Sequence, residues 1–216
     1  MNTTSYRYYI LTNRDCNYFV MRYNIFMKTE ILKYTEQVLN ETPLEISEIP
    51  QIPLYMDQIV SLMANQKKDS EDKILTKTMI HNYSKAKIIK PIKGKTYPRE
   101  QLIQLLMVYV LKNMLTMEEL KQVMVQMYDT SQLGEEGFER CYQRFLDFEK
   151  SKVNDSDELM KKLIPDDKSK TPYEDALVSL LTITSLANQL QKVAEKIVEV
   201  YYPKKVKKEK NKGEKK

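Results

Sequence analysis

Apolar residues recur along most of this chain at intervals of three and four, which is the spacing of one face of a helix. The pattern predicts a short helix over residues 29–40 and a second helix over residues 54–64. Three prolines between them remove backbone donors and indicate a linker: Pro43, Pro50 and Pro53.

The middle of the chain predicts a short helix followed by two short extended segments that are joined by a turn. Thr76 can cap a helix over residues 77–85, because its hydroxyl accepts an orphan amide hydrogen bond of the first turn. The stretch from Ile88 to Tyr97 alternates and turns at Gly94, which predicts a small two-stranded wing. This is the only β signal in the sequence.

Three further helices follow the predicted wing. Pro98 suits the first position of a helix whose apolar residues cover a broad surface up to Leu111. Residues 116–119 have the spacing of a capping box and predict the start of the next helix. After a break come four aromatic residues at steps of 4, 3 and 3, which we interpret as core rather than as a ligand site: Phe138, Tyr142, Phe145 and Phe148.

The longest predicted helix runs from about Thr171 to Tyr202 and is ended by Pro203. Eight of its residues repeat at alternating steps of 4 and 3, the spacing of a coiled-coil seam. Such a seam fits either a helix of the chain's own bundle or the same helix of a second copy. The seam consists of Ala176, Leu180, Ile183, Ala187, Leu190, Ala194, Ile197 and Tyr201.

Composition argues against most enzyme sites that can be recognised from sequence. The chain has 216 residues with only 4 glycines, and it contains neither of the glycine-rich phosphate-binding motifs. One histidine, His81, and two cysteines, Cys16 and Cys141, cannot supply the four ligands of a Cys/His zinc site. We therefore expect a protein that is not an enzyme and that needs no metal or cofactor. Two distant single cysteines favour a reducing compartment, hence the cytoplasm, and no apolar run is long enough to span a membrane.

The formal net charge of +5 is distributed unevenly along the chain. Residues 73–99 contain 8 basic and no acidic side chains, and residues 203–216 contain 8 basic and 2 acidic ones. The remaining two segments are net acidic. Concentrated positive charge of this kind indicates a polyanionic partner, although a lysine-rich tail alone is often only solvated surface.

The basic segment coincides with the predicted helix and wing, which is the arrangement that a winged helix-turn-helix uses on duplex DNA. Lysines there would neutralise phosphates and release counterions. Asn82 could pair with an adenine edge, and His81 could donate to a base or phosphate.

Residues 76–127 resemble the DNA-binding domain of the MerR family of bacterial regulators. Those proteins have an arginine-tyrosine-tyrosine helix, a glycine-leucine-leucine-x-proline corner and a wing that ends in tyrosine. Here the corner is Lys87-Ile88-Ile89-Lys90-Pro91, and the wing tyrosine is Tyr97. Three positions depart from the family: His81 replaces the arginine, Asn82 the first tyrosine and Lys87 the corner glycine. The predicted DNA contacts are Thr76, Lys77, Thr78, His81, Asn82, Lys85, Lys87, Lys93, Lys95, Tyr97 and Arg99.

A second resemblance covers about residues 49–200. The stretches "MDQIVSLM" and "EDKILTKTMIHNYSKAKIIKP" are similar to a bacterial domain-of-unknown-function family, number eighteen thirty-six, which is itself thought to be MerR-like. The resemblances imply an all-α fold with a small β-wing, in which a winged helix-turn-helix is followed by a helical bundle and a long C-terminal helix. The expected domains are residues 27–48, an N-terminal helix and linker; residues 49–132, the MerR-like part; residues 133–202, a helical domain; and residues 203–216, a disordered lysine-rich tail.

The leading functional hypothesis is a transcriptional regulator that binds double-stranded DNA as a homodimer on a palindromic site. The family analogy also allows an unidentified effector at the C-terminal domain. The main alternative is a protein-interaction module that reuses the winged fold without DNA, and a weaker one is a small helical enzyme or ligand-binding protein with an unrecognisable site.

Residues 1–26 lack a helical period, whereas Met27 opens a regular one. They are therefore either a translated upstream region or a genuine disordered or docking arm.

Overall fold

The structure is a computed structural model that describes residues 28–65, 75–92, 94–129, 136–164 and 172–204. The predicted N-terminal arm and the lysine-rich tail lie outside the described residues, apart from the first two residues of the tail. The chain divides into two compact units. Unit 1 comprises residues 1–41 and 151–187, and unit 2 comprises residues 42–150 and 188–216. These units do not coincide with the domain boundaries expected from the sequence, which stay a prediction.

Unit 2 contains an extensive hydrophobic core of 23 buried side chains. Its central element is helix α4, in which all six residues from Gln101 to Leu106 are buried. A helix that is surrounded on every side can bury such a continuous stretch, and a surface helix cannot. The elements of this unit in chain order are the 3-10 helix η1 (Ile46–Glu48), β1 (Leu54–Tyr55), α2 (Met56–Asn65), α3 (Lys77–Lys85), β2 (Thr96–Tyr97), α4 (Arg99–Leu111), α5 (Met117–Asp129) and α6 (Gly137–Ser151).

The two strands pair differently from the predicted wing. β2 lies antiparallel to β1, with Leu54 opposite Tyr97 and Tyr55 opposite Thr96. Residues 88–92, the first half of the predicted wing, form no strand, because Ile88 and Ile89 are both fully buried and hold this part of the chain in the core instead. The prediction of a mostly helical protein with one small antiparallel sheet is confirmed. The prediction of a hairpin within residues 88–97 is wrong.

Local signals in the sequence placed the starts of α3 and α5 correctly. Thr76 caps α3 by accepting a 3.2 Å hydrogen bond from the amide of Met79. Before α5, the amide of Thr116 donates to the Glu119 carboxylate over 2.8 Å, and the Glu119 amide donates back to the Thr116 hydroxyl over 3.3 Å. These reciprocal bonds are the capping box that the spacing predicted.

The aromatic series on α6 is only partly core. Phe138 and Tyr142 are buried, Phe145 is half-buried and Phe148 is 64% exposed. The Tyr142 hydroxyl donates a 2.9 Å hydrogen bond to the carbonyl oxygen of Leu44. Burial, followed by the nearby negative charge of Glu45 and Glu48, raises the pKa of Tyr142 well above its usual range, so this tyrosine stays a neutral structural donor.

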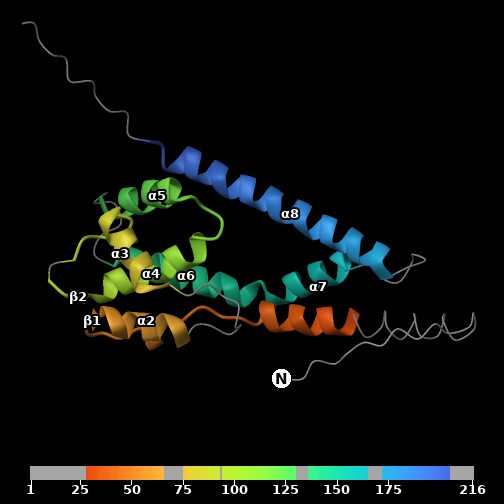
Figure 1. The fold of residues 1–216 in the computed structure, drawn as a ribbon, viewed down its shortest axis with the longest axis horizontal. Coiled ribbons are helices and arrows are strands. Elements are labelled where there is room, and N and C mark those ends of the chain that lie inside the picture. Colours follow the sequence, from red (N-terminus) through yellow and green to blue (C-terminus); the bar gives the residue numbers. More distant parts are fainter. Residues whose placement is uncertain (1–27, 66–74, 93, 130–135, 165–171, 205–216) are drawn as a thin grey trace, which may run out of the picture. The chain divides into compact units, whose positions relative to one another are not determined.

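Unit 1 contains a helix over residues 28–39, helix α7 (Val153–Leu163) and the first part of helix α8 (Pro172–Tyr201). The first of these helices and α8 are expected from the sequence, whereas α7 is not. α8 is one continuous helix whose C-terminal part belongs to unit 2 (Figure 1). No helix among the described residues is long and apolar enough to cross a membrane.

Candidate nucleic-acid interface

Helix α3 divides cleanly into a buried face and an exposed face. Ile80 and Tyr83 are buried in the core of unit 2, and that burial raises the pKa of Tyr83 above its ordinary 10.0. The opposite face is exposed and carries side chains that can donate hydrogen bonds: Lys77, Thr78, His81, Asn82 and Lys85. The core therefore fixes the helix by one face and presents the other to solvent.

The end of α3 is held in a fixed geometry by a left-handed residue. Lys87 has φ 61° and is the only non-glycine residue with a positive φ among those that the structure describes. Its amide donates to the Ser84 carbonyl over 3.0 Å, and the Ile88 amide donates to the Tyr83 carbonyl over 2.8 Å. This pair of bonds is a Schellman motif, in which the left-handed position is usually a glycine because a Cβ atom is strained there. Lys87 thus occupies a position where glycine would be more stable.

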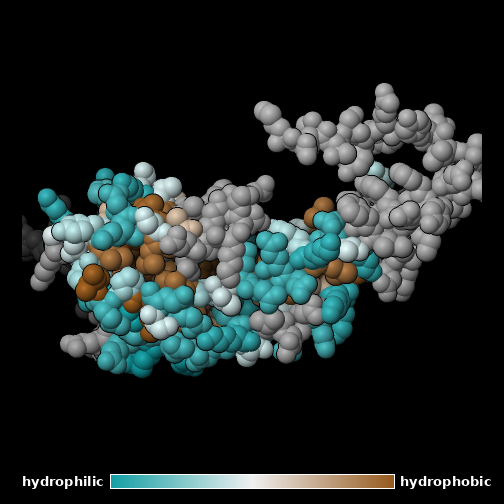
Figure 2. All heavy atoms as spheres, turned by 90° about the horizontal axis from the view of Figure 1, so that it is seen from below, coloured by the Kyte–Doolittle hydropathy of each residue, from teal (hydrophilic) through white to brown (hydrophobic). Residues whose placement is uncertain are grey.

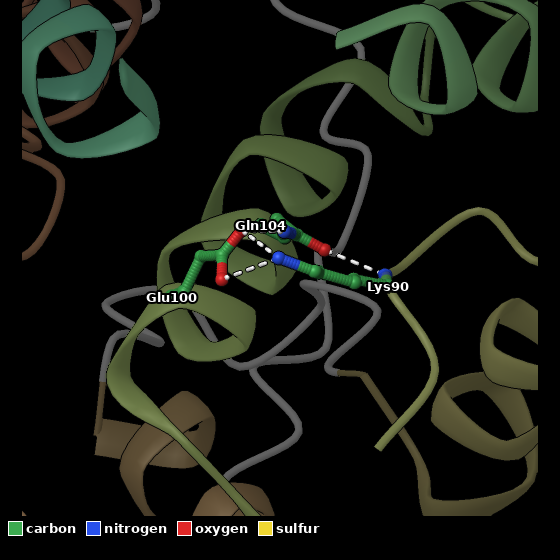
Figure 3. A network of polar contacts seen from close by, with 3 residues as sticks. All are labelled: Lys90, Glu100 and Gln104. Atoms are coloured by element: carbon green, nitrogen blue, oxygen red, sulfur yellow. Dashed lines mark hydrogen bonds and ion pairs between the residues drawn. The ribbon is translucent and has the colours of Figure 1, made fainter. Parts of the chain in front are cut away.

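Acidic residues from neighbouring helices pair with two lysines of the basic segment. Lys77 of α3 forms an ion pair with Asp57 of α2, and both side chains are exposed. Lys90 is bound more extensively (Figure 3). Its ammonium group lies 3.2 Å from the Glu100 carboxylate, while its backbone amide donates to the Gln104 side chain over 2.7 Å. The positive charge of both lysines is therefore partly neutralised within the protein.

Two of the predicted DNA contacts point into the protein. Tyr97 is 3% exposed, and burial raises its pKa. The guanidinium of Arg99 donates to both oxygens of Glu139, at 3.1 and 3.4 Å, and to the carbonyl oxygens of Ile46 and Ile49. Its side chain is only 13% exposed. Arg99 therefore connects the linker, α4 and α6, and neither residue is available on the surface.

The remaining predicted residues that the structure describes are exposed, along α3 from its N-cap onward and in the chain that follows it. Lys85, Lys87 and Lys95 are exposed and make no ion pair with any described residue. Thr76, Thr78, His81 and Asn82 are exposed as well, and Lys93 lies outside the described residues. We call Lys85, Lys87 and Lys95, together with the exposed face of α3, the basic surface.

The acidic neighbours of this surface are not evident from the sequence. Asp57 and Glu100 lie outside the segment whose charge was counted, and only the packing of α2 and α4 brings them to Lys77 and Lys90. No periodicity or spacing in the sequence signals these pairs. The real basic surface is consequently smaller than the eight cations of residues 73–99 suggest.

The described residues contain no group of three or more histidine, cysteine, aspartate or glutamate side chains placed to hold a metal ion. Cys141 is a half-buried free thiol on α6. The arrangement of α3 and the basic surface therefore offers binding chemistry: ammonium groups for anions, and hydroxyl, imidazole and amide groups for directional hydrogen bonds.

Comparison with known proteins agrees with the second resemblance over part of the chain. Residues 44–145 match the model of a family described as a domain of unknown function, DUF1836. This range almost coincides with the first segment of unit 2, and it ends well before the residue 200 expected from the sequence. No curated protein and no solved structure matches the chain. The family description supplies no activity.

Proposed function

We propose that this protein is a DNA-binding transcriptional regulator that uses α2, α3 and the chain after α3 as a MerR-like winged helix-turn-helix. In this reading α3 is the recognition helix and enters the major groove, whose width of about 12 Å accommodates an α-helix. The basic surface binds the phosphates beside the groove, and His81 and Asn82 contact base edges.

The observation that carries the proposal is the basic surface itself. Three lysines that make no ion pair with any described residue, Lys85, Lys87 and Lys95, lie at and after the end of a helix that is anchored in the core by Ile80 and Tyr83 and that exposes a hydrogen-bonding face. Each lysine that neutralises a phosphate releases a condensed counterion and so favours binding. A rigid helix with polar side chains on one face then supplies contacts that depend on sequence.

The conformation of Lys87 supports the MerR-like part of the proposal. The MerR resemblance aligns Lys87 with the corner glycine of that family, and the residue has the positive φ that favours glycine. A lysine in a strained position is best explained by a use for its charge, because glycine would relieve the strain. Contact between Lys87 and a phosphate is such a use.

A homodimer on a palindromic site completes the proposal. Two recognition helices about 34 Å apart reach successive major grooves on one side of the duplex. Among the eight predicted seam residues of α8, Ile183 and Ala194 are half-buried and the other six are exposed. The exposure of the seam supports pairing with a second copy rather than packing within the chain's own bundle.

One observation favours the alternative of a protein-interaction module. Ile52 is 67% exposed and Tyr55 is 58% exposed. Figure 2 shows hydrophobic side chains gathered over the end of the molecule that carries β1 and α2. Apolar surface of this kind is more typical of a protein partner than of a phosphate backbone. If this alternative holds, the protein will bind no duplex DNA in the experiment below.

The deciding experiment measures duplex DNA affinity as a function of salt concentration. We expect log affinity to fall linearly with log salt, and the combined change Lys85→Ala and Lys87→Ala to reduce that slope by about 2. Lys162→Ala removes one charge from an exposed position on α7 and serves as the control that leaves the slope unchanged. A parent slope near zero, or an equal effect of the control, would exclude the basic surface as a DNA-binding site.

A further inference from the structure

The described part of unit 1 has almost no core of its own. Its only buried residues are Thr35 and Ile164, whereas unit 2 buries 23 hydrophobic side chains. At the same time, nine large hydrophobic side chains of unit 1 are between 42% and 72% exposed, the most exposed being Tyr173. Helices are stable in water mainly through burial of an apolar face. As a single copy, the described part of unit 1 therefore lacks the burial that would hold its helices together.

The lack of buried apolar surface is clearest in the first part of α8. From Ala176 to Gln191 the helix has no charged residue. Its exposed hydrophobic residues lie mainly along one side, at successive steps of four and three: Tyr173, Leu177 and Leu180, with Leu181 beside them. Asp175, Ser179, Ile183 and Leu186 of the same helix are half-buried instead. The helix thus has one side on its own chain and an apolar, uncharged side in water.

The exposed area is large enough for a stable protein interface. A half-exposed large apolar side chain presents on the order of 100 Å², so the nine, which are distributed over the three helices of unit 1, together present on the order of 900 Å². One partner of a specific protein complex typically buries about 800 Å². Apolar patches above a few hundred Å² are rarely left in water by soluble proteins.

We propose that unit 1 is an obligate homodimerisation module whose core is completed by unit 1 of a second copy. A unit that cannot fold alone needs a partner that is always present in equal amount, and a second copy of the chain meets this requirement by itself. A helix side with coiled-coil spacing is also complementary to the same side of an identical helix. Unit 1 lies entirely outside the family match at residues 44–145, so this module is separate from the matched part of the chain.

The inference specifies the homodimer of the proposed function, but it does not depend on DNA binding. Sedimentation of the full chain without DNA tests it directly, with an expected mass of twice 25.6 kDa at micromolar concentration. The thermal midpoint should also rise with protein concentration, because a dimer that dissociates on unfolding is stabilised by mass action. A monomer at all concentrations overturns the inference. Loss of DNA binding by a dimer overturns only the proposed function.

Variants on α8 locate the interface. The double change Leu177→Glu and Leu180→Glu places two carboxylates in the shared core and should weaken dimerisation by on the order of 100-fold or more. Thr182→Glu adds a carboxylate to the same uncharged run away from this side of the helix, and it should keep the dimer mass. A double variant that stays folded by circular dichroism and keeps the dimer mass overturns the assignment to this face. If it unfolds, the mass and the concentration-dependent midpoint of the parent still decide whether a dimer exists.

The main competing occupant of this face is the chain's own residues 1–26. A shortened chain that begins at Met27 distinguishes the two. We expect the shortened chain to sediment as a dimer, as the full chain does. A monomeric full chain together with a dimeric shortened chain would show that these residues cover the face, and it would overturn the inference for the intact protein.

Discussion

The hydroxyl of Tyr128, near the end of α5, donates a 2.5 Å hydrogen bond to the carbonyl oxygen of Lys87, the left-handed residue that follows α3. This bond fixes the one strained backbone position of the candidate interface from a different helix. The direction of the chain that follows α3 therefore depends on α5 as well as on the bonds that cap the end of α3.

Tyr128→Phe should destabilise the protein by about 1 kcal/mol, because the carbonyl oxygen of Lys87 loses a hydrogen-bond donor. Urea unfolding of parent and variant measures the difference. DNA affinity should fall with little change in salt slope, since the charges remain and only their placement is loosened. A variant with parent stability would show that solvent replaces the donor without cost.

Lys87→Gly should have opposite effects on stability and on DNA binding. Glycine adopts a positive φ without strain, so the free energy of unfolding should rise by about 1 kcal/mol. The loss of one phosphate contact should lower the salt slope by about 1. Lys87→Ala is the matched control, because it removes the same charge but keeps a Cβ atom. If both variants leave the slope unchanged, Lys87 does not contact phosphate.

Arg99→Lys separates a structural role from a DNA contact. Lysine keeps the positive charge but cannot reproduce the forked bonds to Glu139, Ile46 and Ile49. We expect a loss of about 2 kcal/mol in unfolding free energy, because hydrogen bonds to a charged group are among the stronger ones. The DNA salt slope should stay at the parent value. A lower DNA salt slope together with an unchanged free energy of unfolding would show that Arg99 contacts DNA.

Thr116→Ala should cost about 1 kcal/mol of stability at neutral pH through loss of the α5 cap. The Thr116 side chain and amide hold the pKa of Glu119 below its ordinary 4.5. A depressed folded-state pKa gives stability that is present above 4.5 and is lost as pH falls through the folded-state pKa. The stability difference between parent and variant should therefore shrink on acidification below about pH 4.5. A difference independent of pH would mean that the Glu119 charge contributes nothing.

Features of the sequence that act over a few residues predicted the structure well. The Thr76 cap, the Thr116–Glu119 capping box and the extent of α3 depend on neighbours within one helical turn. The left-handed backbone of Lys87 was not predicted, and only the structure shows it together with its Schellman bonds.

Features that depend on distant segments were missed or wrong. The alternation after Ile88 resembled a hairpin, but β2 pairs with β1, in which Leu54 lies over 40 residues before its partner Tyr97. Arg99 was counted as surface charge because its acidic partner Glu139 lies 40 residues further along the chain. Charge totals over a segment cannot report such pairs, which only the packed helices create.

Leu190→Glu tests whether the predicted seam extends beyond unit 1. Leu190 is 58% exposed and lies on the same seam as Leu180, followed by Ile197, which is 49% exposed. If the seam pairs two copies along α8, a carboxylate at this position is buried without a partner, and that costs several kcal/mol. We expect monomers in sedimentation and loss of binding to a palindromic duplex, because one half-site alone contributes too little affinity. Circular dichroism must show that the variant keeps its helix content. A folded variant with the dimer mass would restrict the interface to unit 1, whereas the Leu177 and Leu180 changes would still dissociate it.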